Sequence, residues 1–84
     1  MAYYVYILRS LADGELYVGS TANVRKRLQR HNMGFVPSTR HRRPLELVYQ
    51  EQHASRSAAV MREKHLKSLE GSREKTRLVA GSSS

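Results

Sequence analysis

The 84-residue chain carries five polar side chains whose types and spacing suit the hydrolysis of a phosphodiester bond. They are two phenols near the N-terminus, a guanidinium and an imidazole four residues apart, and one distant carboxylate: Tyr6, Tyr17, Arg27, His31 and Glu63. A guanidinium, and a metal ion held by a carboxylate, stabilise the charge that develops on a phosphate, and a phenolate or a neutral imidazole can accept a proton. The set predicts metal-assisted phosphodiester cleavage if the fold brings its members together.

The elements that must position these groups follow one another in the order ββαβαα. Tyrosine and β-branched residues are dense in the first two segments, which is typical of strands, and the Asp13-Gly14 pair between them predicts a turn. We expect strands over residues 3–9, 15–19 and 45–52, and helices over about 22–33, 55–69 and 72–79. This order predicts an α/β (α+β) fold, with a three-stranded, largely antiparallel sheet flanked by helices.

Periodicity places the candidate residues on these elements. Asn23, Arg27 and His31 recur every four residues, so they share one face of the first helix, beside the apolar pair Val24 and Leu28. Glu63 flanks the apolar stripe of the second helix, which we expect to be Ala58, Ala59, Leu66 and Leu69. Alternation in the third strand predicts that one side of the sheet receives Leu45, Leu47 and Tyr49, and the other Glu46, Val48 and Gln50.

Composition favours one small domain over residues 1–80, followed by a flexible Gly-Ser tail over residues 81–84. A chain of this size buries only roughly 60% of its unfolded surface, so its core is thin. The sequence has no cysteine, no apolar run near the ~20 residues that span a bilayer, and no basic region before its first apolar stretch. We expect a cytoplasmic protein with no membrane partner.

The formal net charge of +8 is unevenly distributed. No acidic residue occurs between Glu15 and Glu46, an interval that holds His31, His41 and seven other basic residues: Arg25, Lys26, Arg27, Arg30, Arg40, Arg42 and Arg43. Such a block is the electrostatic pattern of a nucleic-acid-binding surface, although a solvated basic face or a contact with anionic lipid would have the same composition. No helix here has the large apolar face that suits a membrane surface.

The motifs resemble the GIY-YIG nucleases in a VYI…YVG form. The resemblance covers about residues 3–79 and rests on four segments: Val5-Tyr6-Ile7 with Tyr17-Val18-Gly19; Ser20-Thr21-x-Asn23-Val24-x-x-Arg27-Leu28-x-x-His31-Asn32-x-Gly34; Pro44-Leu45-Glu46-Leu47-Val48-Tyr49; and Ala58-Ala59-x-x-Arg62-Glu63-x-x-Leu66-Lys67. It is greatest to the short stand-alone members, and it implies the same ββαβαα fold. It also implies a divalent-metal-dependent endonuclease that cuts DNA, or RNA, with little sequence specificity.

The resemblance also implies a role for each candidate residue. Glu63 would hold Mg²⁺ or Mn²⁺, Arg27 would donate to phosphate oxygens, and a tyrosine would help activate the attacking water. We assign that last role to Tyr6 first and Tyr17 second, with His31 holding the water or a tyrosine hydroxyl. The other basic residues would contact the nucleic-acid backbone: Arg25, Lys26, Arg30, Arg40, Arg42, Arg43 and Lys67.

Each of these residues also has a purely structural interpretation. The tyrosines can be packed strand residues, Arg27 can pair with Glu63, and Glu63 can pair with Lys67 one turn further along its helix. The chain departs from parts of the family at Ser20, where some members have lysine, and at Lys75, where others have asparagine. An alternative function is therefore a nucleic-acid-binding module with weak or lost cleavage. The sequence predicts neither a small-molecule cofactor nor a zinc site, and it leaves the oligomeric state open.

Overall fold

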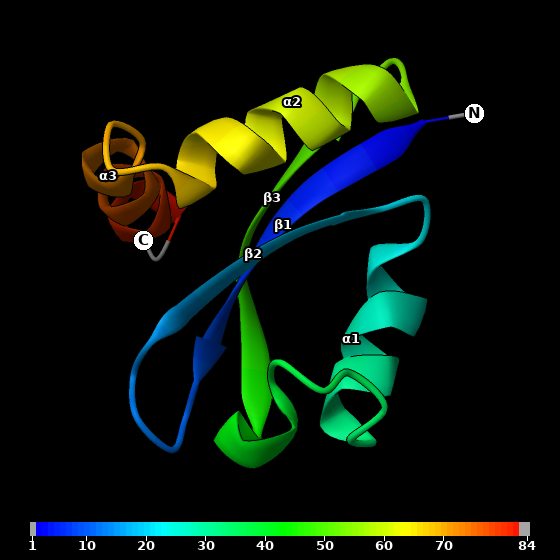
Figure 1. Cartoon of the computed structure of the whole chain (residues 1–84), viewed down its shortest axis with the longest axis vertical. Helices are drawn as coiled ribbons and strands as arrows, with labels where there is room; N and C mark the ends of the chain where they lie inside the picture. The colour runs from blue at the N-terminus through cyan, green and yellow to red at the C-terminus, as the bar shows by residue number, and fades with distance from the viewer. Residues whose placement is uncertain (1, 83–84) are drawn as a thin grey trace.

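The computed structural model describes residues 2–82 and has the predicted order of elements (Figure 1). The elements are β1 (Tyr3–Ser10), β2 (Leu16–Thr21), α1 (Val24–Asn32), a short 3-10 helix η1 (Arg40–Arg42), β3 (Leu45–His53), α2 (Arg56–Lys67) and α3 (Ser72–Ser82). The strands form one sheet in the order β2-β1-β3, and both pairings are antiparallel. The predicted fold class is therefore confirmed. No helix of the described part is long and apolar enough to cross a membrane.

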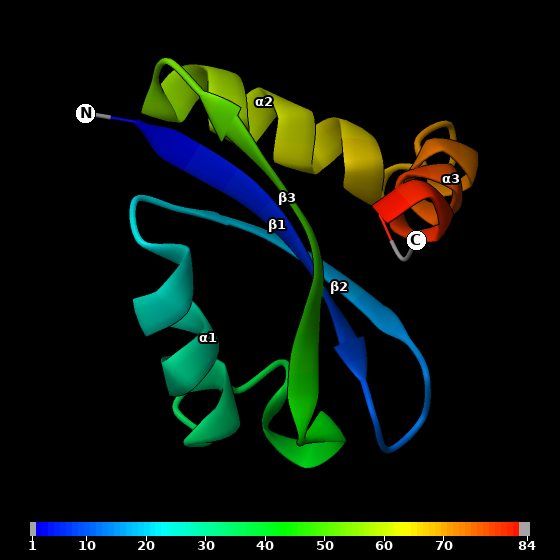
Figure 2. The same ribbon diagram turned by 180° about the vertical axis from the view of Figure 1, so that it is seen from behind.

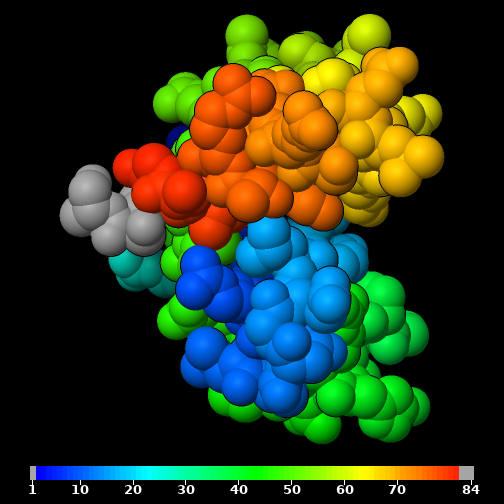
Figure 3. Space-filling model, turned by 90° about the vertical axis from the view of Figure 1, so that its left-hand side faces the viewer, coloured from blue at the N-terminus to red at the C-terminus, as the bar shows by residue number. Residues whose placement is uncertain are grey.

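Helices cover both faces of the sheet, α1 on one side and α2 with α3 on the other (Figures 1 and 2). On the side of α2 and α3, the fully buried Val5, Ile7 and Leu66 form one apolar cluster. On the side of α1, Tyr6, Leu8 and Val24 form another, with Leu28 packed against it. Figure 3 shows α3, in orange and red, above the blue loop end of the β1–β2 hairpin.

The third strand contains a β-bulge that changes its alternation. Ile7 lies opposite Tyr49, but the next residue, Leu8, lies opposite Leu47, so Val48 is the extra residue on β3. After the bulge, Tyr49 packs with Val48 on the side of α2 and α3, whereas Leu47 packs on the side of α1. The prediction that Tyr49 shares a face with Leu45 and Leu47 is wrong, because the bulge shifts the period by one residue.

The helices α1 and α2 both begin at side-chain caps. Asn23 accepts a hydrogen bond from the backbone N–H of Lys26, and Ser55 accepts one from that of Ala58. The chain leaves α1 through Gly34, whose φ of +84° is a conformation that favours glycine. Asn23 therefore starts the helix that carries two of the candidate residues.

The buried stripe of α2 is narrower than predicted. Ala59 and Leu66 are fully buried, but Ala58 is exposed and Leu69 is 93% exposed. Leu69 leaves the stripe because α2 ends at Lys67 and the following Ser68 has an extended backbone. In α3, Val79 docks on the core and the helix continues to Ser82; the remainder of the predicted tail, residues 83–84, lies outside the described residues.

Candidate active site

A chain of buried polar side chains connects the middle of the sheet to α1. The Tyr6 hydroxyl lies 3.0 Å from His31 Nε2, and His31 Nδ1 lies 2.7 Å from Thr39 Oγ1. These three residues are 1%, 0% and 0% exposed. At the outer end of the chain, Arg27 Nε donates to the Tyr6 hydroxyl over 3.4 Å. Each polar group has a partner, so the burial leaves no unsatisfied hydrogen bond among these residues.

Local structure explains why these groups meet. Tyr6 is on the central strand and faces Gly19 on β2, and a Cβ at Gly19 would stand 2.4 Å from the Tyr6 oxygen. The absence of a side chain at Gly19 therefore gives the phenol room to lie across β2. Arg27 and His31 are one turn apart on α1, so both side chains reach the same phenol.

Burial and charge fix the protonation of these three groups. Burial raises the pKa of Tyr6, against the opposing effect of the Arg27 hydrogen bond. Burial, with the nearby Arg27 charge, lowers the pKa of His31 to about 4. The hydrogen bond to Tyr6 raises the pKa of Arg27. At neutral pH the chain therefore consists of a neutral phenol, a neutral imidazole and a charged guanidinium.

Tyr17 lies on the same face of the sheet as Tyr6 but nearer to solvent. It pairs with Leu8 across the β1–β2 ladder and is half-buried. Its ring packs edge-to-face on His31 at 5.0 Å, and Lys67 Nζ lies 5.5 Å from the ring centroid. Within residues 2–82 its hydroxyl has no hydrogen-bond partner, so this phenol is available to a ligand.

Glu63 approaches the same strand from the other side of the sheet. Its Oε1 accepts a hydrogen bond from Ser20 Oγ at 2.6 Å, and its Oε2 accepts one from Lys67 Nζ at 2.7 Å. The carboxylate acts electrostatically on both Tyr6 and Arg27. Because β2 is an edge strand, groups from α1 and α2 can approach one another around it. The five predicted catalytic residues thus gather about β2.

The structure also shows which of the two predicted ion pairs of Glu63 forms. Arg27 and Glu63 form no ion pair within the described residues, whereas Glu63 and Lys67 do. Two residues that hydrogen-bond the catalytic candidates were not predicted from the sequence. Ser20 stands in the family motif and at a departure from lysine, but without a predicted contact to Glu63, and Thr39 stands in a basic loop with no motif to mark it.

The site offers a metal ion one carboxylate. No group of three or more His, Cys, Asp or Glu residues in the described part could hold a metal, which argues against a closed all-protein cage. Mg²⁺ and similar hard cations retain several waters and often take only one or two carboxylates together with substrate phosphate. Glu63, with one hydrogen bond on each oxygen, fits such an ion.

The basic residues predicted to contact phosphates differ in their exposure and in the contacts they already make within the protein. Five are exposed: Arg25, Lys26, Arg30, Arg40 and Arg43. Arg30 lies over the Phe35 ring at 5.6 Å. Arg42 is half-buried and bonds Asp13 over 3.3 Å, so it fastens the β1–β2 loop to η1. Lys67 bonds Glu63, as described above.

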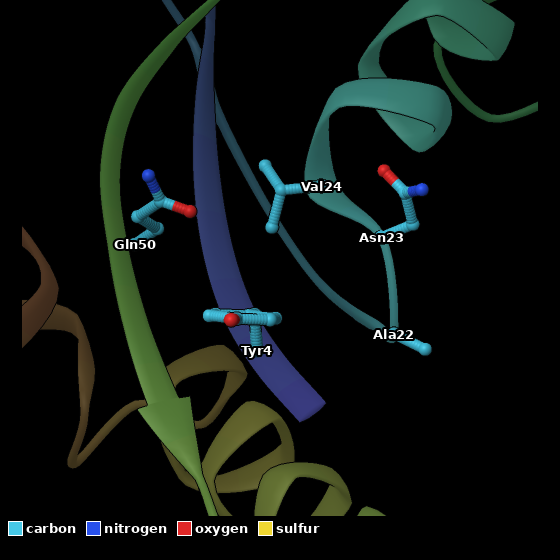
Figure 4. Close-up of a pocket in the computed structure, with 5 residues that line it drawn as sticks. All are labelled: Tyr4, Ala22, Asn23, Val24 and Gln50. Carbon is cyan, nitrogen blue, oxygen red and sulfur yellow. The ribbon is translucent and has the colours of Figure 1, made fainter. Parts of the chain in front are cut away.

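A separate pocket of about 390 Å³ lies between the start of α1 and the strands β1 and β3. Figure 4 shows Tyr4 and Gln50 on the strands, with Ala22, Asn23 and Val24 opposite them. A neighbouring pocket shares Val24 and Gln50. Neither contains any of the five catalytic candidates, because these lie toward β2.

Comparison with known proteins defines the class of this chain. The family model described as the GIY-YIG catalytic domain matches residues 2–77, so the chain belongs to the GIY-YIG family. It is 48% identical over 79 residues to a UPF0213 protein of Natronomonas pharaonis, covering 93% of this chain and 91% of that protein. A UPF0213 protein of Desulfotalea psychrophila is 42% identical over 81 residues, covering 94% and 73%.

A solved structure agrees with the fold. The NMR structure of a UPF0213 protein from Bacillus halodurans is 36% identical, with a TM-score of 0.56 over 95% of this chain and 84% of that one. Members of the GIY-YIG family are generally nucleases and typically use divalent metal ions. The printed names of the UPF0213 relatives state no activity.

Proposed function

We propose that this protein is a divalent-metal-dependent endonuclease that hydrolyses DNA phosphodiester bonds with little sequence specificity, acting in the cytoplasm. The observation that carries the proposal is the gathering of a free phenol, a singly bonded guanidinium and an incompletely saturated carboxylate around one edge strand: Tyr17, Arg27 and Glu63. Family membership supports the same reaction class. RNA remains the alternative substrate.

Burial favours the opposite of our sequence-based order for the two tyrosines. Tyr6 is 1% exposed and already bonded to His31 and Arg27, so an attacking water has poor access to its hydroxyl. Tyr17 is half-buried and its hydroxyl has no partner within residues 2–82. We therefore assign contact with the attacking water to Tyr17, and we assign to Tyr6 and His31 the support of the site from within.

The charged groups have complementary tasks. Arg27 is held through Nε alone, so its two terminal nitrogens remain for phosphate oxygens, whose charge is concentrated in the transition state. A divalent ion, when bound at Glu63, supplies a Lewis-acid charge that stabilises the leaving oxygen. Lys67 can release Glu63 Oε2 and bind a backbone phosphate, because its side chain is 47% exposed.

A metal-dependence assay tests the proposal. Purified protein is incubated with duplex, nicked, branched and single-stranded DNA in Mg²⁺, Mn²⁺ or chelator. We expect cleavage that needs the metal and that Glu63→Gln reduces roughly a thousandfold or more, since Lewis-acid stabilisation is worth several kcal/mol. Glu70→Gln, an equal charge change at an exposed position, should cut like the parent. Undiminished cleavage by a folded Glu63→Gln protein would refute the metal-ligand role.

Salt dependence tests the nucleic-acid surface separately. If the exposed basic face touches about three to five phosphates, the log–log slope of affinity against salt should be roughly −3 to −4.5 for duplex DNA. Replacing Arg25 and Lys26 by alanine should make the slope shallower. Replacing Arg73 and Arg77 on α3 by alanine removes the same two charges outside the block and should leave the slope unchanged. A slope near zero in the parent would contradict a phosphate-binding face.

One observation favours the second candidate function, a binding module with little cleavage. Lys67 Nζ sits on Glu63 Oε2 at 2.7 Å and competes with a metal ion for that oxygen. If the parent binds DNA with the expected salt slope but cuts no substrate in either metal, this function replaces the nuclease. Lys67→Ala should then either restore cleavage or leave binding as the sole activity.

A further inference from the structure

Thr39 is the last residue in the buried series of hydrogen bonds that runs from Arg27 through Tyr6 and His31, and it has no role so far. We propose that Thr39 is a positioning residue, which fixes the tautomer of His31 and, through Tyr6, the direction in which Arg27 presents its guanidinium. The catalytic part of this inference rests on the proposed nuclease function. Thr39 is 0% exposed, so it acts through His31 and never touches substrate.

The hydrogen positions in this series of hydrogen bonds can be assigned one by one, starting at Arg27 and ending at Thr39. Arg27 Nε can only donate, so the Tyr6 oxygen accepts over the 3.4 Å contact. The phenol is buried, and its own hydrogen therefore needs an acceptor. His31 Nε2, at 3.0 Å, is the acceptor that the described residues provide. This assignment makes Nε2 the unprotonated nitrogen of the imidazole.

The remaining proton of the neutral imidazole must then lie on Nδ1. Nδ1–H donates to Thr39 Oγ1 at 2.7 Å, and the Thr39 hydroxyl passes its own hydrogen to the Val36 carbonyl over a longer 3.5 Å contact. All donors in the chain then point the same way, from Arg27 to the Val36 carbonyl. Every buried hydrogen has an acceptor in this arrangement.

The opposite tautomer would disturb Arg27. With a proton on Nε2, His31 would donate to the Tyr6 oxygen, and the phenolic hydrogen would have no acceptor within the described residues, so it would be left to point toward Arg27. There it would meet the Nε–H of the guanidinium, which is also a donor. The Arg27–Tyr6 bond would weaken, and the terminal nitrogens of Arg27 would lose their fixed direction toward a phosphate.

Two variants of Thr39 separate this role from simple packing. Thr39→Val keeps the shape of the side chain but removes the acceptor for Nδ1–H, whereas Thr39→Ser keeps the hydroxyl. The ¹⁵N chemical shifts of the His31 imidazole report which nitrogen is protonated, and the Arg27 Nε–H signal reports whether its hydrogen bond is intact. Both measurements use the whole protein without substrate.

We expect the parent and Thr39→Ser to show the Nδ1–H tautomer, and Thr39→Val to shift toward Nε2–H with faster solvent exchange at Arg27 Nε. Turnover should fall roughly tenfold to a hundredfold in Thr39→Val, the size of effect known for residues that orient metal-binding histidines, with KM little changed. An Nε2–H tautomer in the parent, or an unchanged tautomer in Thr39→Val, would overturn the proposal. If the valine variant fails to fold, Thr39→Ala takes its place.

The two proposals fail in different ways. A parent protein that cuts nothing would end the nuclease proposal, yet its imidazole spectrum would still decide the tautomer. A parent that cuts DNA while holding His31 as Nε2–H would keep the nuclease and remove the role of Thr39.

Discussion

Two glutamate–arginine sets in this molecule use the same chemistry to opposite ends. Glu51 accepts hydrogen bonds from the Tyr49 hydroxyl at 2.7 Å, His53 Nε2 at 2.6 Å and Arg62 Nε at 2.9 Å. Arg62 also bonds Glu74 at 2.7 Å. At the candidate active site, by contrast, each Glu63 oxygen has one hydrogen bond, and Arg27 is held through Nε alone.

The two sets differ in how many of their hydrogen-bonding groups already have partners within the protein. We call a set saturated when nearly all of them do. Glu51 and Arg62 bond to one another and to further partners, so little capacity remains for a ligand. The set also joins β3, α2 and α3, because Glu51, Arg62 and Glu74 each come from a different element. It thereby holds α2, the helix that presents Glu63. The incomplete set at β2 retains donors and lone pairs that a phosphate and a metal ion can use.

The tyrosines give the sharpest test of this comparison. Tyr17→Phe removes a hydroxyl without a partner in residues 2–82, and Tyr49→Phe removes one that bonds Glu51. If Tyr17, as its phenolate, takes the proton of the attacking water, turnover of Tyr17→Phe should fall roughly 10²–10⁴-fold with an unchanged melting temperature. Tyr49→Phe should melt earlier and cut normally. Cleavage assays and thermal melts on both variants decide the matter, and normal turnover by Tyr17→Phe would return the role to Tyr6 or His31.

The arginines give the next largest effect. Arg27→Lys keeps the positive charge but loses the planar fork, so turnover should fall roughly 10²–10³-fold, as when one donor to a transition state is removed. Arg62→Lys breaks part of the saturated set and should lower stability while the folded fraction keeps its turnover. Single-turnover rates, compared with urea unfolding curves, separate the two results. Equal losses of turnover in both variants would show that the distinction is not real.

The sequence predicted the order of the elements because each element carries a local signal, whereas the roles of the five catalytic candidates rest on the family resemblance and stay a prediction. Strand composition, the Asp13-Gly14 turn and helical spacing depend on neighbours within a few residues, and the structure confirms the order of elements they predict. The β-bulge at Val48 and the exposed Leu69 were missed, because register and helix ends are set by packing between distant segments. Such information is absent from periodicity alone.

The finer organisation of the site also lay beyond the sequence. The burial of Tyr6 depends on Gly19, α1 and the loop that carries Thr39, so exposure could not rank the two tyrosines before the fold was known. The contacts of Ser20 with Glu63, and of Thr39 with His31, join residues 43 and 8 positions apart. Hydroxyl residues occur in most loops, and a single serine or threonine carries no signal for such a contact.

Lowering the pH should destabilise the folded protein through the protonation of His31. The pKa of His31 is about 4 in the folded protein, against its ordinary value of 6.5, so the unfolded chain binds the proton first as the pH falls. Stability is therefore fully present above pH 6.5 and decreases through this window by up to about 3 kcal/mol. Urea unfolding at stepwise pH should show this slope in the parent but not in His31→Gln. The same slope in both proteins would place the titration elsewhere.

Changes to the set of Glu51, Arg62 and Glu74 should have the smallest effect, and that effect should be on stability alone. Hydrogen bonds lower the pKa of Glu51 below its ordinary value despite burial, and arginine and histidine contacts lower that of Glu74. Both carboxylates are therefore ionised at neutral pH, and the stability that they contribute is lost as the pH falls through their lowered pKa values.

Glu51→Gln removes this charge at neutral pH and leaves Arg62 with a weaker acceptor. We expect a loss of about 1.5–3 kcal/mol, the range for hydrogen bonds to charged groups, and an earlier melt by about 4–8 °C per kcal/mol in a chain this small. Turnover of the folded fraction should be unchanged, because Glu63 and Arg27 keep their own contacts. A variant that melts normally but cuts slowly would contradict the comparison, because Glu51 would then act on the site and not on stability.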